Sequence, residues 1–473
     1  MKRFKILCVL LSLMLVMTFT ACSTSSRNNS STDNTGNDGG TTGKQTSDNV
    51  KVDTIVMWSN DTHNQSVYEE AVKEFNNTIG KEKGIIVDYS VFGSDYYNTL
   101  DVAVTAGEGP DIFKCNKVGK YSEAGYIMAW DDIEGLKGLI DRFNVYNAPG
   151  YGIFGDKTYA VPLKVTNYGL ACNLEIFRKN NLEVPKTWDE MREAARIITE
   201  NGGGKIYGYA LAMGYGSYNY FYVNLPNAAA VGDEYFNHTT GRYDFLSLEG
   251  FFNHVLDIIK DGSMFPGYET MDGDTARAQF SAGNIGMIGV MSSDVATFKN
   301  QFPVSFEYEV VPYPVKDAGN HYKYPTGVSL SYVINSQVAK KGVEDKVAEF
   351  LNYLYSDDIF VETYEKQLDI PIEGEKITSK AKTENLDPNW IRFADMNTFY
   401  IKYPNPDSDV AVVGETYQEV YNKILVGAVD VHNALADLTE RYNKALDEAI
   451  ASGKVNIDNY IDKNLEAKRA WGK

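Results

Sequence analysis

The feature that most constrains the fold is a regular alternation of short apolar runs with stretches of helical spacing. The first apolar run is VDTIVMW at 52–58. Apolar residues then recur three and four positions apart from Val67 to Phe75, and Gly80 is expected to end this helix. A second strand-like run, IIVDYSVF at 85–92, precedes another helical stretch. Strands that alternate with helices predict an α/β fold with a mainly parallel sheet.

The alternation continues along the chain. NYGLACN at 167–173 has the composition of a buried strand, and Thr187 with Glu190 forms a capping box at the start of a strong amphipathic helix. Further on, TGVSLSYVI at 326–334 predicts one strand, and 343–367 predicts one helix. The alternation of strands and helices is therefore expected in both the N-terminal and the C-terminal parts of the chain.

Size and charge narrow the class of protein. Roughly 420 residues follow Lys51, more than a single domain usually holds, so two lobes are expected. The formal net charge is −19, and it becomes −22 if residues 1–21, with their three basic side chains, are removed. Binding to phosphate backbones requires a basic surface, so nucleic acid is not an expected partner. An acidic body also gains nothing from an anionic membrane surface.

The N-terminus has the features of an export signal. Three basic residues precede an apolar run at 6–19, which is shorter than the roughly 20 residues of a membrane span. Small residues and Cys22 follow, an order that resembles the lipobox of bacterial lipoproteins. Residues 1–21 are therefore expected to be a lipoprotein signal peptide, and Cys22 to carry lipid; a plain secretory signal with a chance cysteine is the alternative. Residues 22–50 are polar and rich in Ser, Thr, Asn and Gly, which predicts a disordered tether.

Two further cysteines, Cys115 and Cys172, would remain in the mature chain, at a spacing that matches no metal motif. They could pair in an oxidising compartment. Two separate small buried residues are favoured, because a single bridge in so large a chain is not a disulfide framework.

Five segments, in their order and spacing, carry a resemblance to a known family. They are VMW ending at Trp58, AGEGPDIF at 106–113, YAVPLKVTNYGLACN at 159–173, VPKTWDEM at 184–191 with YGYAL downstream, and FSAGNIGMIGV at 280–290. The chain from about 52 to 455 resembles the extracellular solute-binding proteins that serve bacterial sugar importers of the ATP-binding-cassette (ABC) type, the broad family of maltose-binding protein. Two positions depart from the family: Cys172 stands where Tyr is frequent, and VMSSDV at 290–295 lacks a frequent Trp.

The resemblance implies a two-lobed periplasmic-binding-protein-like fold of type II, with a ligand cleft between lobes joined by hinge strands. Lobe one would comprise 51–163 and 315–368, and lobe two 164–314 and 369–473, with crossings near LKVT, PYPV and LDIP. It also implies the function: a lipid-anchored receptor, monomeric and without a cofactor, that captures a carbohydrate, most simply an oligosaccharide, and delivers it to an ABC importer permease. The expected location is the outer face of the cell membrane, on the surface of a Gram-positive bacterium.

A sugar site combines aromatic rings, which cover sugar faces, with carboxylates and amides that hold hydroxyls. The densest aromatic run, 213–222, contains Tyr215, Tyr218 and Tyr220, and the resemblance places it beside the cleft, although these rings could also form one face of a strand or helix. Trp58, Asn60 and Asp61 lie where the first strand ends, the edge at which α/β sheets collect ligand groups. The other candidates are Asn116, in the segment Lys114–Asn116; Lys164, at the first crossing; Ser293 and Asp294; Tyr324; and Trp390. Trp58 and Trp390 could instead be core rings, and Lys164 could be solvated.

Three motifs of common enzyme classes are absent from the sequence: it has no HExxH, GxSxG or P-loop pattern. Paired carboxylates of a glycosidase can still meet in space, so a secreted carbohydrate-active lipoprotein is the alternative from another class. Within the family, a polyamine, peptide or metal ligand is the alternative. The scarcity of histidine and the aromatic loop disfavour a metal, and no metal site is expected.

Overall fold

The computed structural model describes residues 51–93, 95–214 and 225–472 of the chain. The segments predicted to be the signal peptide and the tether, with Cys22, and the three candidate tyrosines Tyr215, Tyr218 and Tyr220 lie outside these ranges. Within the described ranges, no helix combines the length and the apolarity that a membrane crossing requires.

The first of the three main sheets has five strands in the order β2-β1-β3-β15-β4, of which only β15 runs against the others. Its strands are β1 (Asp53–Ser59), β2 (Ile85–Val91), β3 (Ile112–Phe113), β4 (Ile127–Met128) and β15 (Val333–Asn335). The helices of this part are α1 (Gln65–Asn77), α2 (Ile79–Lys83), α3 (Tyr96–Thr105), α4 (Val118–Glu123), α5 (Lys137–Phe143), α11 (Gln337–Lys341), α12 (Glu344–Leu354) and α13 (Asp357–Glu365). This sheet confirms the mainly parallel arrangement predicted from the alternation.

The first helix shows where periodicity predicts well and where it does not. Val67 and Phe75 of α1 are buried in the core, as their spacing predicts. Gly80 does not end this helix, because α1 ends at Asn77 and Gly80 lies inside α2. A Cβ atom at position 80 would lie only 2.6 Å from the carbonyl oxygen of Ile85, so the glycine allows α2 to pack closely on the start of β2.

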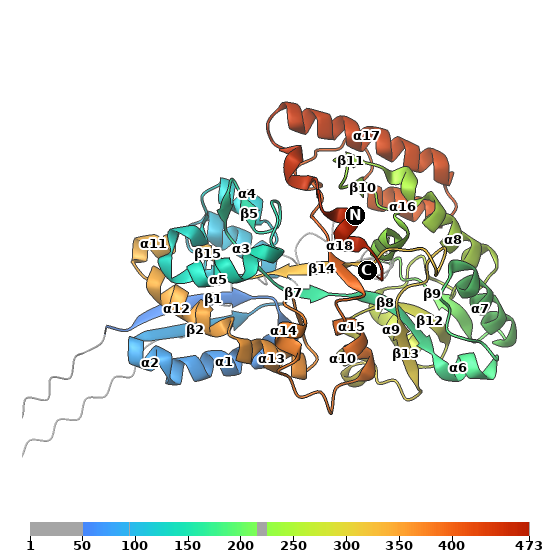
Figure 1. Ribbon diagram of the computed structural model, residues 1–473, viewed down its shortest axis with the longest axis horizontal. Coiled ribbons are helices and arrows are strands. Elements are labelled where there is room, and N and C mark those ends of the chain that lie inside the picture. The colour runs from blue at the N-terminus through green and yellow to red at the C-terminus, as the bar shows by residue number, and fades with distance from the viewer. Residues whose placement is uncertain (1–50, 94, 215–224, 473) are drawn as a thin grey trace, which may run out of the picture. The chain divides into compact units, whose positions relative to one another are not determined.

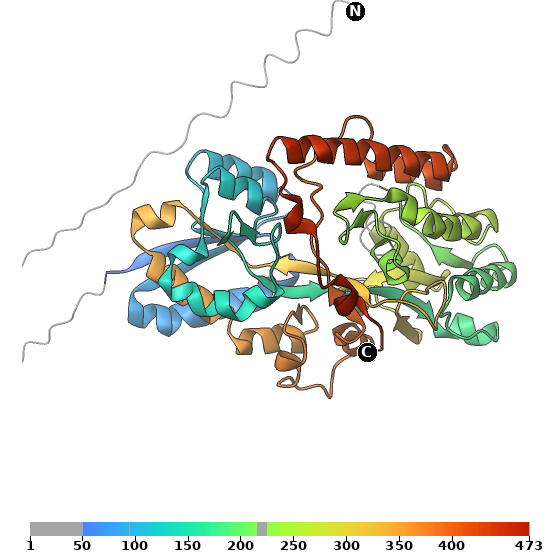
Figure 2. The ribbon, with the colours of Figure 1, turned by 45° about the horizontal axis from the view of Figure 1, so that its top comes forward.

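The second sheet has four strands in the order β13-β8-β12-β9, in which β12 is parallel to β9 and antiparallel to β8. Its strands are β8 (Tyr168–Asn173), β9 (Tyr207–Ala210), β12 (Ile285–Met291) and β13 (Tyr308–Val311). The helices here are α6 (Leu174–Lys179), α7 (Trp188–Asn201), α8 (Glu249–Lys260), α9 (Gly273–Ser281), α10 (Asp294–Asn300), α16 (Tyr417–Leu425) and α17 (Val431–Ala451). The predicted capping box of Thr187 and Glu190 is present at α7. Both α16 and α17 pack against α8. The long helix α17 lies at the top of the view in Figure 2.

A third sheet joins these two parts, and its strands run between them (Figure 1). Its order is β16-β7-β14-β17, with β7 (Pro162–Thr166) antiparallel to β14 (Tyr324–Leu330) and to β16 (Ile370–Pro371), and β17 (Phe399–Ile401) parallel to β14. The short helices α14 (Glu375–Thr378), α15 (Pro388–Ala394) and α18 (Leu465–Arg469) and the two-stranded pairs β5–β6 (Ile153–Phe154, Lys157–Thr158) and β10–β11 (Phe236–Asn237, Arg242–Tyr243) complete the fold.

Two of the three expected crossings coincide with strands of the third sheet. LKVT lies in β7, and LDIP contains β16. PYPV does not cross, because Val315 stays paired with the loop before α7: its amide donates to the Lys186 carbonyl and its carbonyl accepts from the Trp188 amide. The crossing strand β14 begins later, at Tyr324.

Candidate functional site

Four buried or nearly buried charged side chains meet where β1 and β3 end against the third sheet. Asp61 follows β1, Lys114 follows β3, Lys164 lies within β7, and Asp369 precedes β16. Strand β1 is parallel to β3, so the carboxyl ends of both strands reach the same edge of the first sheet. We refer to these four residues as the charge cluster.

The charge cluster is held by ion pairs and backbone contacts. The Lys164 ammonium lies 2.8 Å from Asp369 Oδ2 and 3.8 Å from Asp61 Oδ2. The Lys114 ammonium lies 3.6 Å from the same Asp61 oxygen, and it donates to the carbonyl of Leu330 at 2.6 Å and to Ser329 Oγ at 3.3 Å. Two cations and two carboxylates therefore share one small volume, with Asp61 between the cations.

Burial and neighbouring charges act against each other on these groups. Burial opposes ionisation of Asp61 and of Asp369, but the nearby ammonium groups outweigh it, and the pKa of each carboxyl lies below its ordinary value. Burial also opposes protonation of Lys164, yet Asp369 and other negative neighbours keep its pKa raised. Burial dominates at Lys114, whose pKa is lowered despite Asp61. At neutral pH both carboxylates are ionised.

One oxygen of the charge cluster lacks a hydrogen bond. Asp61 Oδ2 is buried, and no donor among the described residues lies within hydrogen-bonding distance of it. A buried carboxylate oxygen without a hydrogen bond costs free energy, and at Asp61 the two ammonium groups at 3.6 and 3.8 Å offset part of that cost. The rim beside it is polar: Asn64 Nδ2 donates to Asp369 at 2.6 Å, and the exposed His63 ring lies 3.3 Å from the same carboxyl.

Half-buried aromatic rings flank the charge cluster on the β1–α3 side. The ring of Trp58 lies 4.8 Å from that of Phe92, Phe92 lies 5.9 Å from Tyr96, and Tyr96 lies 5.0 Å from Tyr97. Tyr96 is buried and its hydroxyl donates to the Lys114 carbonyl at 2.7 Å, which fixes the row to the end of β3. The three outer rings remain partly exposed and can cover the apolar face of a ligand.

The third sheet presents a row of four residues beside the charge cluster, of which Lys164 is buried and the other three are partly exposed. Register pairs Ser329 with Lys164 and Gly327 with Thr166, so these four residues alternate onto one face. The Tyr168 hydroxyl lies over Gly327, only 2.8 Å from where a Cβ atom would stand. The absence of a side chain at this position therefore lets the tyrosine lie across the crossing strand.

The structure brings four of the sequence candidates together: Trp58, Asn60, Asp61 and Lys164 share this region. Lys164 is not a solvated crossing residue but a buried member of two ion pairs. Asn116 is exposed in the loop beyond Lys114.

Sequence reasoning missed Asp369. It is distant in the chain from Lys164, and only the pairing of β16 with β7 brings the two together. The motif LDIP marked a crossing of the chain, and nothing in it indicated a ligand group.

Two of the three other candidates, Asp294 and Tyr324, have hydrogen-bond partners for their side chains, whereas the Ser293 side chain forms no cap hydrogen bond at the start of α10. Asp294 is buried and accepts hydrogen bonds from Arg277 Nε at 2.8 Å and from the Met291 amide at 2.9 Å, while Ser293 precedes α10. Tyr324 is buried, and its hydroxyl donates to the Tyr313 carbonyl at 2.6 Å. These partners occupy the polar groups that were expected to reach a ligand.

The ring of Trp390 is fully buried against Tyr364, with 5.7 Å between ring centroids. It offers no face to a ligand in this structure, so its position matches the alternative, a core ring. Cys115 and Cys172 are both free thiols.

Comparison with known proteins gives a consistent result. The family model described as bacterial extracellular solute-binding protein matches residues 59–359. The sn-glycerol-3-phosphate-binding periplasmic protein UgpB of Brucella melitensis is 24% identical over 422 residues, covering 81% of this chain and 90% of that protein. The melibiose/raffinose/stachyose-binding protein MelE of Bacillus subtilis is 30% identical over 116 residues, which span 24% of this chain and only 26% of that protein.

Among solved structures, the cyclic alpha-maltosyl-1,6-maltose binding protein from Arthrobacter globiformis superposes with a TM-score of 0.63 at 21% identity. The match covers 84% of this chain and 99% of that one. A likeness at this identity establishes the two-lobed α/β fold.

Proposed function

The chain belongs to the bacterial extracellular solute-binding protein family, and on that premise we propose that it is a lipid-anchored receptor that captures a carbohydrate and delivers it to an ABC importer permease. The proposed ligand is an oligosaccharide, bound between two lobes. Lobe one comprises 51–163 and 324–368, and lobe two comprises 164–323 and 369–473; the limit expected at 315 moves to 324 because Val315 stays paired with the loop before α7. Binding favours the closed arrangement of the lobes, and the permease recognises that arrangement; such a population shift requires that the ligand bind the closed form more tightly.

The charge cluster is the observation that carries the proposal. Its two ammonium groups donate hydrogen bonds, its carboxylates accept them, and its formal charges cancel. A sugar hydroxyl both donates and accepts, and it carries no charge, so a small displacement that admits it would let it bridge the Asp61 oxygen that lacks a hydrogen bond and a neighbouring ammonium without leaving a charge uncompensated. The row of Trp58, Phe92 and Tyr97 supplies apolar surface for sugar C–H faces.

A phosphate ester is the rival that the Brucella relative raises. Lys114 and Lys164 could hold a phosphate, but Asp61 and Asp369 would lie against the same dianion. Like charges in a buried site disfavour binding strongly, so the four-charge balance favours a neutral polyol. For a metal ligand, the described residues contain no group of three His, Cys, Asp or Glu side chains placed to hold an ion.

A thermal-shift panel tests the ligand class. Saccharides of one to four units should raise the melting temperature with a logarithmic dependence on concentration. Asp61→Asn should abolish this shift, whereas Asp101→Asn, a surface carboxylate paired with Lys117, should preserve it. If sn-glycerol 3-phosphate, a polyamine, a peptide or a divalent cation shifts the protein while every saccharide fails, the carbohydrate assignment is wrong. Cleavage of labelled oligosaccharides would instead support the glycosidase.

The lipid anchor is tested separately. Cys22→Ser should remove lipid labelling and release the protein into the medium, or leave it unprocessed at the membrane. Persistent lipid labelling of this variant would contradict the proposal that Cys22 is acylated. The thermal-shift response to saccharides should be unchanged, because the cysteine precedes the folded body.

A further inference from the structure

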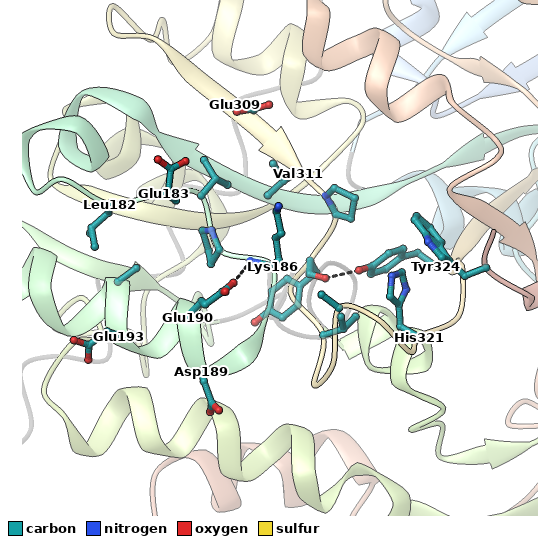
Figure 3. A pocket seen from close by; sticks show the side chains of 18 residues that line it. Leu182, Glu183, Lys186, Asp189, Glu190, Glu193, Glu309, Val311, His321 and Tyr324 are labelled. Atoms are coloured by element: carbon teal, nitrogen blue, oxygen red, sulfur yellow. Dashed lines mark hydrogen bonds between the residues drawn. The ribbon is translucent and has the colours of Figure 1, made fainter.

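A second hollow lies away from the charge cluster, beside the edge strand of the second sheet. Its volume is about 1040 Å³. Its walls are the segment 182–186, the first two turns of α7, the strand β13, the connection at 312–324, and Trp471 (Figure 3). The carboxylates lie on the α7 and β13 side, and the aromatic rings lie together at the other end (Figure 3). We call it the α7 groove.

The floor of the α7 groove is aliphatic. Val184, Pro185, Val311, Pro312 and Val315 line it, and Val315 is held by backbone hydrogen bonds to the loop before α7. The outer edge of β13 is not available for strand addition, because Asn389 Oδ1 accepts from the Val310 amide at 2.8 Å. An occupant would therefore be recognised by its side chains and not by pairing with β13.

One end of the α7 groove is an aromatic wall held by the backbone. Trp471 is 41% exposed, and its ring lies 4.3 Å from that of His321. Ala470 bridges to Tyr322, and the Arg469 carbonyl accepts from the Lys323 amide at 2.8 Å, which anchors the segment that carries the tryptophan. An exposed tryptophan beside an apolar floor is a frequent anchor point of protein interfaces.

The rim of the α7 groove is acidic. Five carboxylates, Glu183, Asp189, Glu190, Glu193 and Glu309, line it with one cation, Lys186. Three are engaged within the protein: Glu190 in the helix cap, Glu193 with Arg196 and Glu309 with Arg392. Glu183 and Asp189 are exposed and form no ion pair within the described part of the chain. The rim therefore has negative charge to offer a partner.

We propose that the α7 groove docks a short segment of a partner protein in which basic side chains alternate with apolar ones. The apolar side chains would cover the valine and proline floor and Trp471, and the basic ones would meet Asp189 and Glu183. The positive charge of Lys186 repels basic side chains of the partner and therefore weakens this attraction. The groove is built from lobe-two elements and Trp471, so the proposal does not depend on the identity of the cleft ligand.

The test uses two blocked hexapeptides, one of alternating lysine and leucine and one of alternating glutamate and leucine, titrated by calorimetry at physiological salt. The basic peptide should bind and the acidic one should not. Asp189→Lys should weaken binding by about fivefold or more, and Trp471→Ala should weaken it comparably. Lys186→Glu should tighten it. The control Glu200→Lys makes the same charge change as Asp189→Lys on the same helix, outside the groove, and should have a small effect.

Each outcome separates specific docking from general attraction to an acidic protein. Equal weakening by Asp189→Lys and Glu200→Lys would overturn the proposal, as would comparable binding of the acidic peptide or no binding of the basic one. Unfolding midpoints of the variants should stay near that of the parent chain, since all these side chains are exposed or partly exposed. A saccharide response that is unchanged in these variants while peptide binding falls would show that groove and cleft are separate sites.

Discussion

Two buried histidines should make the folded state sensitive to mild acid. The ring of His254 in α8 stacks on Trp188 at 5.1 Å with an interplanar angle of 10°, and its Nε2 has no hydrogen-bond partner within the described residues. Burial, assisted by the positive charge of Arg192, lowers the pKa of His254 to about 3. His238 is also buried, and burial with the nearby Lys402 lowers its pKa to about 4.

The magnitude follows from these pKa values. Each histidine is neutral in the folded protein and has an ordinary pKa of 6.5 when unfolded, so the unfolded chain binds more protons as the pH falls below 6.5. Stability is therefore full above pH 6.5 and declines until the folded-state pKa is reached. At about pH 5 the loss is about 2 kcal/mol for each histidine, or about 4 kcal/mol for both, relative to neutral pH.

Urea unfolding of the parent chain and of His254→Phe, at about pH 7.5 and about pH 5, measures this loss. Phenylalanine fits the apolar stack on Trp188 and cannot titrate, so the variant should lose about 2 kcal/mol less than the parent between the two pH values. The difference between the proteins is the relevant quantity, because Asp294 and Asp407 have raised pKa values and act in the opposite direction. Equal losses in the parent and the variant would refute the reasoning.

Three further predictions concern the charge cluster, the crossing strand β14 and, outside the binding region, the helix α5. Asp369→Asn should destabilise the fold by about 3–5 kcal/mol, because it leaves the buried Lys164 ammonium without its closest carboxylate. Adding Lys164→Met should recover part of this loss. If chemical unfolding shows that the effects of the two changes simply add, the two residues do not form a direct pair. Gly327→Ala should weaken saccharide binding in calorimetry, because the new Cβ atom displaces the Tyr168 hydroxyl; unaltered affinity would show that this tyrosine does not shape the cleft. Gly138→Ala, with no heavy atom within 4 Å of the new Cβ in α5, should leave binding unchanged and stabilise the helix by up to about 1 kcal/mol, which a thermal melt can check.

Local signals predicted the elements well. The spacing of Val67 and Phe75 predicted α1, and the Thr187–Glu190 box predicted the start of α7, because both depend on residues within two turns of each other. The ends of the elements were predicted less accurately than their type. TGVSLSYVI was predicted as one strand, but it contributes β14 and β15 to different sheets, since apolar alternation does not encode which sheet a strand joins.

The long helix predicted over 343–367 is two helices, α12 and α13, separated at Tyr355 and Ser356. Ser356 adopts an extended backbone conformation as the N-cap residue of α13. A serine before two aspartates is a helix-start signal, but the apolar periodicity continues across it and therefore predicts one helix where there are two.

Site prediction depended on distance along the chain. Asp61 and Lys164 follow or occupy strands that the resemblance had located, so both were within reach of sequence reasoning. Their partner Asp369 was not, because the pairing of β16 with β7 is a long-range event. Trp390 illustrates the converse, since the sequence of a tryptophan's neighbours does not reveal whether its ring faces solvent or the core, and here it faces the core.

The placement of Lys164 has an evolutionary consequence. This residue belongs at once to the charge cluster and to β7, one of the strands that joins the two halves of the protein, and its partner Asp369 adjoins a second such strand. A mutation at either residue that changes ligand preference therefore also changes the strands that join the two lobes. Changes of ligand preference in this lineage should therefore accumulate first among the aromatic rings near β1, where affinity can drift while the link stays intact. In a sensor built from this scaffold, those aromatic rings are therefore the residues to vary, and the charge cluster should be kept unchanged.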